Sequence, residues 1–177
     1  MFKEASIKVV AGPEKKSQVV IEKERVLTAY HESGHAIVSG FLEDNDKVHM
    51  ITIIPRGRAG GFTAYLPQED AKFMTKRQMQ HKLISLLGGR AAEEVVLDDI
   101  STGASNDIER ATKIAHAMVT KYGMSKRLGP MMYGGDDSEV FLGEELGKNK
   151  QYSDKIAYEI DSEMRELIDE AYNKALN

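Results

Sequence analysis

Apolar and small side chains recur about every 3.6 positions over residues 22–42, which predicts an amphipathic helix. The stripe is formed by Val26, Leu27, Tyr30, Gly34, Ile37, Val38 and Phe41. His31 and His35 fall in line with this stripe, so we expect both imidazoles to point toward the core. Two histidines and the intervening Glu32 are costly to bury unless they are paired or bound to a metal ion.

Alternating patterns predict a small sheet after this helix. Residues 48–54 are rich in β-branched side chains and end at Pro55, and residues 62–66 form a second strand pattern. The glycine-rich residues 56–61 lie between them and predict a flexible turn. The two segments would make a small hairpin-like sheet, which is too small to be stable alone.

The remainder of the chain predicts helices. A capping box that begins at Thr75 starts a helix through about Leu87, and we expect Gly88 and Gly89 to end it. Further helices are predicted at residues 90–97, at residues 107–122 with a stop at Gly123, and from a Ser153 cap to the chain end. The inner face of the last helix is formed by Ile156, Ile160, Met164, Leu167, Ile168, Ala171 and Tyr172. The predicted class is mainly α with one small β-sheet.

Residues 31–35 read His-Glu-Ser-Gly-His, the H-E-x-x-H arrangement of zinc peptidases. Two histidines four positions apart share one face of a helix, so both can bind one zinc ion. Glu32 lies between them and directs its carboxylate beside the open coordination position, where it acts as general base toward a zinc-bound water. The motif therefore predicts a helical zinc metallopeptidase domain, with His31 and His35 as ligands and Glu32 as the catalytic base.

A catalytic zinc ion usually has three protein ligands, so the third must come from elsewhere in the chain. The candidates are His49, His81, His116, Glu93, Glu94, Asp98, Asp99 and Asp107. Asp107 follows Asn106, which we expect to cap a helix, and the first turn of a helix favours a carboxylate. A purely helix-starting role for Asp107 is the alternative. These local arguments favour Asp107 over Glu93 and leave the choice open.

Composition restricts the remaining possibilities. The chain has no cysteine, which excludes disulfides and thiolate zinc sites, and its net charge of −4 does not indicate a nucleic-acid partner. No apolar run approaches the roughly 18–20 residues that span a bilayer, and no signal peptide is visible. The first twenty residues are polar and predict a connecting arm. We therefore divide the chain into an arm at residues 1–20 and a zinc peptidase domain at residues 21–177.

Several ordered blocks resemble the peptidase domain of the FtsH family, the membrane-anchored, ATP-dependent AAA zinc proteases. The blocks lie at residues 27–36, 88–94, 101–112, 122–125, 128–130 and 141–143. By this resemblance His31, His35 and Asp107 hold one zinc ion per chain and Glu32 is the catalytic base. The resemblance implies an endopeptidase for unfolded or membrane-protein substrates, in a homo-hexameric ring whose zinc sites face an enclosed chamber.

The resemblance also implies parts that this chain does not carry. Family members have transmembrane helices and an AAA ATPase module upstream, and the P-loop pattern G-x-x-x-x-G-K-[ST] does not occur here. Residues 1–20 then correspond to the end of that module, and the chain to a separated, soluble protease domain. ATP binding and membrane attachment are expected of the parent protein alone, with this domain in the cytoplasm or an organelle interior.

An extended substrate can add a strand to an exposed sheet edge through main-chain hydrogen bonds. We take residues 49–54 as the candidate edge, although a core strand would have the same pattern, and the glycine-rich turn as a lip over the cleft. The expected substrate-binding residues are His49, Met50, Ile51, Thr52, Ile53, Gly60 and Gly61. Two other functions stay open: an unrelated small zincin that acts alone on peptides, and a metal-stabilised structural ring. Glu32 argues against the ring, because a closed structural site needs no base.

Overall fold

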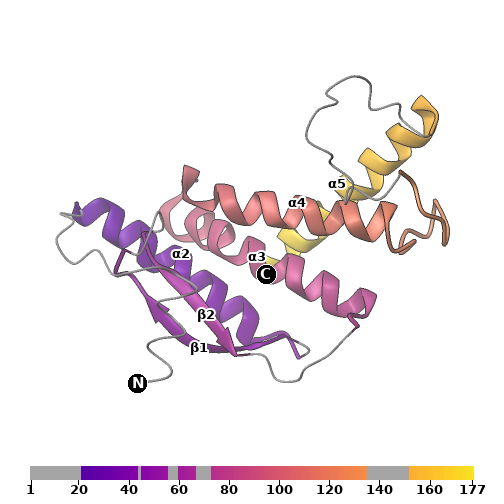
Figure 1. Cartoon of the computed structure of the whole chain (residues 1–177). Coiled ribbons are helices and arrows are strands. Elements are labelled where there is room, and N and C mark those ends of the chain that lie inside the picture. The colour runs from indigo at the N-terminus through magenta and orange to yellow at the C-terminus, as the bar shows by residue number, and fades with distance from the viewer. Residues whose placement is uncertain (1–20, 44, 56–59, 67–72, 135–151) are drawn as a thin grey trace, which may run out of the picture.

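The computed structural model describes residues 21–43, 45–55, 60–66, 73–134 and 152–177. The α-helices in this part are α2 (Glu22–Gly40), α3 (Lys76–Leu97), α4 (Ser105–Thr120) and α5 (Asp154–Leu176). Helix α3 packs against the other three helices, so that α2 lies along one side of it and α4 and α5 lie along the other (Figure 1). The predicted class, mainly α with a small sheet, is confirmed. No helix in the described part combines the length and apolar character needed to cross a membrane.

Strands β1 (Lys47–Thr52) and β2 (Phe62–Leu66) form a two-stranded antiparallel sheet, close to the two predicted segments. The register pairs Ile51 with Thr63, and a shift between Val48 and Met50 makes a bulge. The sheet lies against α2 (Figure 1), as the small size of the sheet requires.

The main hydrophobic core lies where α3 meets α4 and α5. It consists of Met79, Leu83, Ile84, Leu86, Leu87, Ala111, Ala115, Met118 and Ala171. The predicted inner face of α5 is confirmed, since Ile160 and Ala171 are buried and the other members of that face pack partly buried against the core. The capping box at Thr75 and the Ser153 cap are also confirmed. This core fixes α4 relative to α3, and α4 carries one of the site residues.

The predicted helix break at Gly88 and Gly89 is wrong, because α3 continues through both residues to Leu97. A Cβ atom at Gly34 of α2 would lie 2.4 Å from the Gly88 carbonyl oxygen and 2.5 Å from the Ala92 Cβ. The glycines therefore allow the backbones of α2 and α3 to approach closely. The packing of two helices offsets the cost of glycine inside a helix, which is about 1 kcal/mol per residue.

The apolar stripe of α2 faces the core only in part. His31 and His35 are buried as expected, but Ile37 is 61% exposed and Phe41 is 86% exposed. The buried residues of this helix are His31, Glu32, Gly34, His35 and Ser39. The close approach at Gly34 turns the buried set toward α3, together with Val38 of the apolar stripe, which contacts Gly88.

Helix α4 begins differently from the prediction. A 3-10 turn, η1 (Thr102–Ala104), precedes it, and the Ser101 hydroxyl accepts a hydrogen bond from the Gly103 N–H at 3.0 Å. Asn106 is therefore not the cap: α4 starts at Ser105, and Asp107 lies in its first turn. The Ser101 side chain caps the 3-10 turn, and α4 follows this turn with no side-chain cap of its own.

Candidate metal centre and active site

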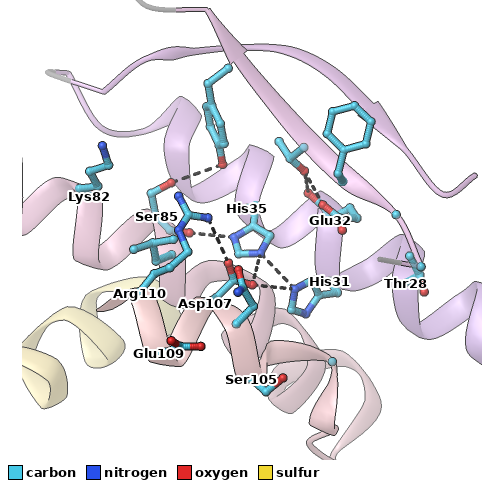
Figure 2. A pocket seen from close by; sticks show the side chains of 18 of the residues that line it. Thr28, His31, Glu32, His35, Lys82, Ser85, Ser105, Asp107, Glu109 and Arg110 are labelled. Atoms are coloured by element: carbon cyan, nitrogen blue, oxygen red, sulfur yellow. Dashed lines mark hydrogen bonds and ion pairs between the residues drawn. The ribbon is translucent and has the colours of Figure 1, made fainter. Parts of the chain in front are cut away.

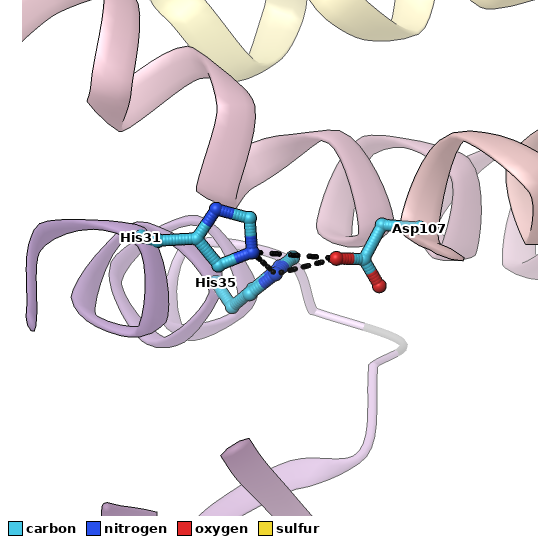
Figure 3. Close-up of side chains that lie close together, drawn as sticks. All are labelled: His31, His35 and Asp107. Atoms are coloured by element: carbon cyan, nitrogen blue, oxygen red, sulfur yellow. Dashed lines mark hydrogen bonds and ion pairs between the residues drawn. The ribbon is translucent and has the colours of Figure 1, made fainter. Parts of the chain in front are cut away.

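Three side chains converge where α2 meets the first turn of α4. The Nε2 atoms of His31 and His35 lie 3.1 Å apart, and each lies 3.3 Å from Oδ2 of Asp107 (Figure 3). The two imidazoles come from consecutive turns of α2 and are buried, and Asp107 is half-buried. Within the described residues, no other group of three histidine or acidic side chains is arranged to hold a metal ion.

The other nitrogen of each imidazole is bonded to the protein. His31 Nδ1 lies 2.6 Å from Oε1 of Glu93, and His35 Nδ1 lies 2.8 Å from the carbonyl oxygen of Ser85. Because a carbonyl and a carboxylate only accept, both Nδ1 atoms donate, and the proton of each neutral ring is on Nδ1. The two Nε2 lone pairs and a carboxylate oxygen therefore face one another.

These residues fit a zinc ion. Three acceptors at this separation repel one another unless a cation lies between them. Tetrahedral zinc with ligands at 2.0–2.1 Å would hold neighbouring donor atoms about 3.3–3.4 Å apart, and the three separations here are 3.1 to 3.3 Å. Imidazole nitrogen and carboxylate oxygen are also donor types that zinc accepts.

Glu93 lies behind the converging donors and not among them. It is fully buried, with Oε1 on His31 and Oε2 accepting a hydrogen bond from the Ser101 N–H at 2.7 Å. It thus connects α2 to the turn that leads into α4. Of the two carboxylates that the sequence left open as third ligand, the structure brings Asp107 to the histidines and gives Glu93 an orienting position.

Glu32 is buried beside the three donors, on the side of β2. Its Oε2 atom lies 2.7 Å from the Thr63 hydroxyl, which donates to it (Figure 2). Burial raises the pKa of the Glu32 carboxyl, and the Thr63 hydrogen bond offsets only part of that increase. Sequence reasoning missed Thr63, because no local pattern indicates which strand residue reaches the helix.

Charges within the cluster oppose the cost of burial. Burial disfavours the charged forms of Asp107 and His31, but the two imidazoles lower the pKa of Asp107. Asp107 and Glu93 together raise the pKa of His31 above its ordinary value. The cluster thus favours an ionised Asp107 carboxylate opposite the imidazole pair.

A cavity of about 870 Å³ opens over the cluster (Figure 2). Its lining comes from α2, β2, α3 and α4 and includes Gly60, Gly61, Phe62, Thr63 and Tyr65. Of the expected substrate-binding residues, Gly60 and Gly61 line it, whereas His49, Met50, Ile51, Thr52 and Ile53 do not. The strand that lines the cavity is therefore β2. The Thr63 hydroxyl of β2 contacts Glu32, and β1 pairs with β2 and also packs against α2.

The sequence matches the family model described as Peptidase family M41 over residues 18–177. The chain belongs to peptidase family M41. An M41 relative named "ATP-dependent zinc metalloprotease FtsH 1", from Thermoanaerobacter sp., is 56% identical over 174 residues, which cover 98% of this chain and 28% of that protein. "ATP-dependent zinc metalloprotease FtsH 2" from Alkaliphilus metalliredigens is 59% identical over 169 residues, 96% of this chain and 24% of that protein.

"ATP-dependent zinc metalloprotease FtsH" from Bacillus subtilis is 50% identical over 173 residues, which cover 97% of this chain and 27% of that protein. The M41 chain thus spans about a quarter of the length of these curated relatives. The predicted FtsH family and the predicted peptidase class are confirmed by these matches.

Proposed function

We propose that this chain hydrolyses peptide bonds at a zinc ion held by His31, His35 and Asp107, as the proteolytic part of a larger ATP-dependent protease. The observation that carries the proposal is the convergence of three acceptor atoms within 3.3 Å, with both Nδ1 atoms already used as donors. The names of the relatives, ATP-dependent zinc metalloproteases, support both the metal and the larger parent. ATP would bind only in the parent.

When bound, zinc would supply Lewis acidity that polarises the scissile carbonyl and lowers the pKa of a water molecule. Glu32 accepts a proton from this water while the water oxygen forms a bond to the carbonyl carbon. Glu32 then passes the proton to the amine nitrogen while the C–N bond breaks. The Thr63 hydroxyl donates to Oε2 of Glu32 and so orients the carboxylate, while no described residue donates a hydrogen bond to Oε1.

We propose the edge of β2 as the place where an extended substrate binds. Within the described residues β2 pairs with β1 on one side only, and it lines the cavity next to Glu32. A Cβ atom at Gly61 would lie 2.5 Å from the Thr52 carbonyl oxygen, so glycine is required where β2 enters the site. Main-chain hydrogen bonds discriminate little between side chains, so this mode of binding suits unfolded polypeptides of varied sequence. Slower amide hydrogen exchange in β2 on binding of a peptide hydroxamate would support this edge, and unchanged exchange would contradict it.

We also propose that the parent is a homo-hexamer in which these domains form a ring. The support is the family membership, and a closed ring requires a head-to-tail interface. Light scattering at micromolar concentration distinguishes a six-fold mass from a monomer. A monomeric mass would mean that the other modules of the parent protein hold the ring together. Membrane attachment of the parent, with this domain in the cytoplasm or an organelle interior, is a further proposal that fractionation of cells with the full-length protein tests.

The Glu32→Gln variant tests the mechanism, because the amide keeps the size of the side chain but cannot accept the proton. We expect zinc content to stay at one ion per chain while cleavage of a fluorogenic peptide falls by about 10²-fold or more. Glu24→Gln is the matched control, because it removes an exposed acid from the same helix. Turnover of Glu32→Gln near that of the control would contradict the proposed base.

Metal analysis of two further variants tests the ligands. His35→Ala and Asp107→Ala each remove one converging donor, so both should lose zinc. Full zinc content with intact cleavage in Asp107→Ala would reject this residue as a ligand.

A further inference from the structure

Peptide hydrolysis develops negative charge on the scissile carbonyl oxygen, and a fixed donor close to that oxygen stabilises the transition state. Two hydroxyl groups near the site take part in hydrogen bonds within the protein: Thr63 with Glu32 at 2.7 Å, and Tyr65 with Ser39 and Ser85 at 3.3 and 3.4 Å. The cations among the described lining residues are Lys82 and Arg110. A charged donor to the oxyanion, other than the metal, is therefore one of these two residues.

Arg110 is the one of the two that touches the converging donors. Its Nη1 atom lies 3.7 Å from Oδ1 of Asp107, the carboxylate oxygen that faces away from the imidazoles. The two residues are three positions apart on α4, so the helix holds the guanidinium beside the ligand carboxylate. This contact is single and long, and the Arg110 side chain is 54% exposed. Most of its five N–H donors therefore remain free to bind a group in the cavity.

The position of Arg110 complements that of the base. Figure 2 shows Glu32 beside β2 and Arg110 on α4, on opposite sides of His35 and Asp107. A carbonyl whose carbon faces water held by Glu32 turns its oxygen away from the carboxylate, because like charges repel. We propose that Arg110 is a catalytic residue whose guanidinium donates to the scissile carbonyl oxygen as that oxygen becomes an oxyanion. This proposal rests on the proposed function.

The competing explanation is that Arg110 acts only through Asp107, by holding its carboxylate toward the metal. The two explanations differ in zinc affinity. A residue that positions a ligand changes zinc binding when it is removed, whereas a donor to the oxyanion changes kcat and the binding of transition-state analogues.

The test compares Arg110→Met with Lys113→Met in the full 177-residue chain. Lys113 lies three positions further along the same helix, carries the same charge and does not line the cavity. The measurements are kcat and KM with a fluorogenic peptide, zinc affinity by chelator competition, and affinity for a peptide phosphonamidate. We expect Arg110→Met to lower kcat by about 10²-fold and to weaken phosphonamidate binding by a similar factor. KM and zinc affinity should stay within about three-fold of the values of Lys113→Met.

A kcat within about three-fold of the control would overturn the inference and leave the proposed function standing. A loss of zinc affinity that matches the loss of kcat would overturn it in favour of a positioning role. If Arg110→Met does not fold, Arg110→Lys keeps the charge without the planar fork, and a loss of about ten-fold in kcat at unchanged zinc affinity is then expected. If the wild-type chain neither binds zinc nor cleaves, the proposed function fails and this inference fails with it.

Discussion

At the scale of single residues, the tautomer of each imidazole decides which nitrogen faces the metal. That tautomer depends on what the other nitrogen of the same ring binds. Glu93 is 0% exposed and accepts from two donors, His31 Nδ1 and the Ser101 N–H, which belong to different elements. It therefore fixes the tautomer of one imidazole and also holds the turn that precedes Asp107. Outer partners of this kind commonly change metal affinity by 10–100-fold when they are removed.

Glu93→Ala should weaken zinc binding by about 10–100-fold and lower the free energy of unfolding by about 1–3 kcal/mol, because two buried donors lose their acceptor. Chelator competition and urea unfolding measure the two effects. Glu24→Ala, an exposed acid on α2, serves as the control. Zinc affinity equal to that of the control would show that Glu93 does not orient His31.

At the scale of elements, the site depends on how closely α2 and α3 pack. Gly34 and Gly88 face each other across this contact, and a Cβ atom at Gly89 would lie 2.6 Å from Nε2 of both His31 and His35. These glycines would weaken an isolated helix. In the folded chain they allow α2 and α3 to approach closely, and the imidazoles then pack against α3. The positions of Glu93 and Ser85 behind the rings follow from that contact.

Gly34→Ala should destabilise the fold by about 1–3 kcal/mol, because the added Cβ overlaps the Gly88 carbonyl oxygen and the two helices must move apart. Gly40→Ala in the same helix has no atom within 4 Å of the added Cβ. It should therefore be neutral or stabilise by roughly 0.4–1 kcal/mol. Urea unfolding of both variants gives the comparison, and equal stabilities would disprove the steric argument.

At the scale of the whole molecule, α5 completes the core and also bonds to α3 near its C-terminal end. The Tyr172 hydroxyl donates to Oε2 of Glu94, and Tyr172 packs against the main core. Burial together with this hydrogen bond raises the pKa of Tyr172 to about 12, compared with about 10 for an unperturbed tyrosine. The ionised phenol is therefore disfavoured in the folded chain.

The sign of the pH dependence follows from this shift. The stability that Tyr172 contributes is fully present below about pH 10 and is lost as the pH rises to about 12. Tyr172→Phe should show a flatter decline of unfolding free energy over this range. The chain has seven tyrosines, so the difference in tyrosinate absorbance between the two proteins isolates this residue. A difference titration centred near pH 10 would contradict the raised pKa.

Local sequence determined those features that depend on neighbours along the chain. The spacing of His31 and His35 places both rings on one face of α2, and the capping groups at Thr75 and Ser153 start their helices as predicted. A helix period and a cap act over a few residues, so the sequence carries them without any knowledge of the fold. The family resemblance added Asp107, which local arguments had only favoured.

Tertiary structure alone decided which distant groups meet. His31 and Asp107 are 76 positions apart in the sequence, and His31 and Glu93 are 62 apart. Only the packing of α2, α3 and α4 places Asp107 among the converging donors and Glu93 on the opposite side of the His31 ring. The same holds for β2 in place of β1 beside the cavity and for the uninterrupted helix at Gly88. In each case the deciding contact lies between elements, where close packing outweighs the local preference that the sequence displays.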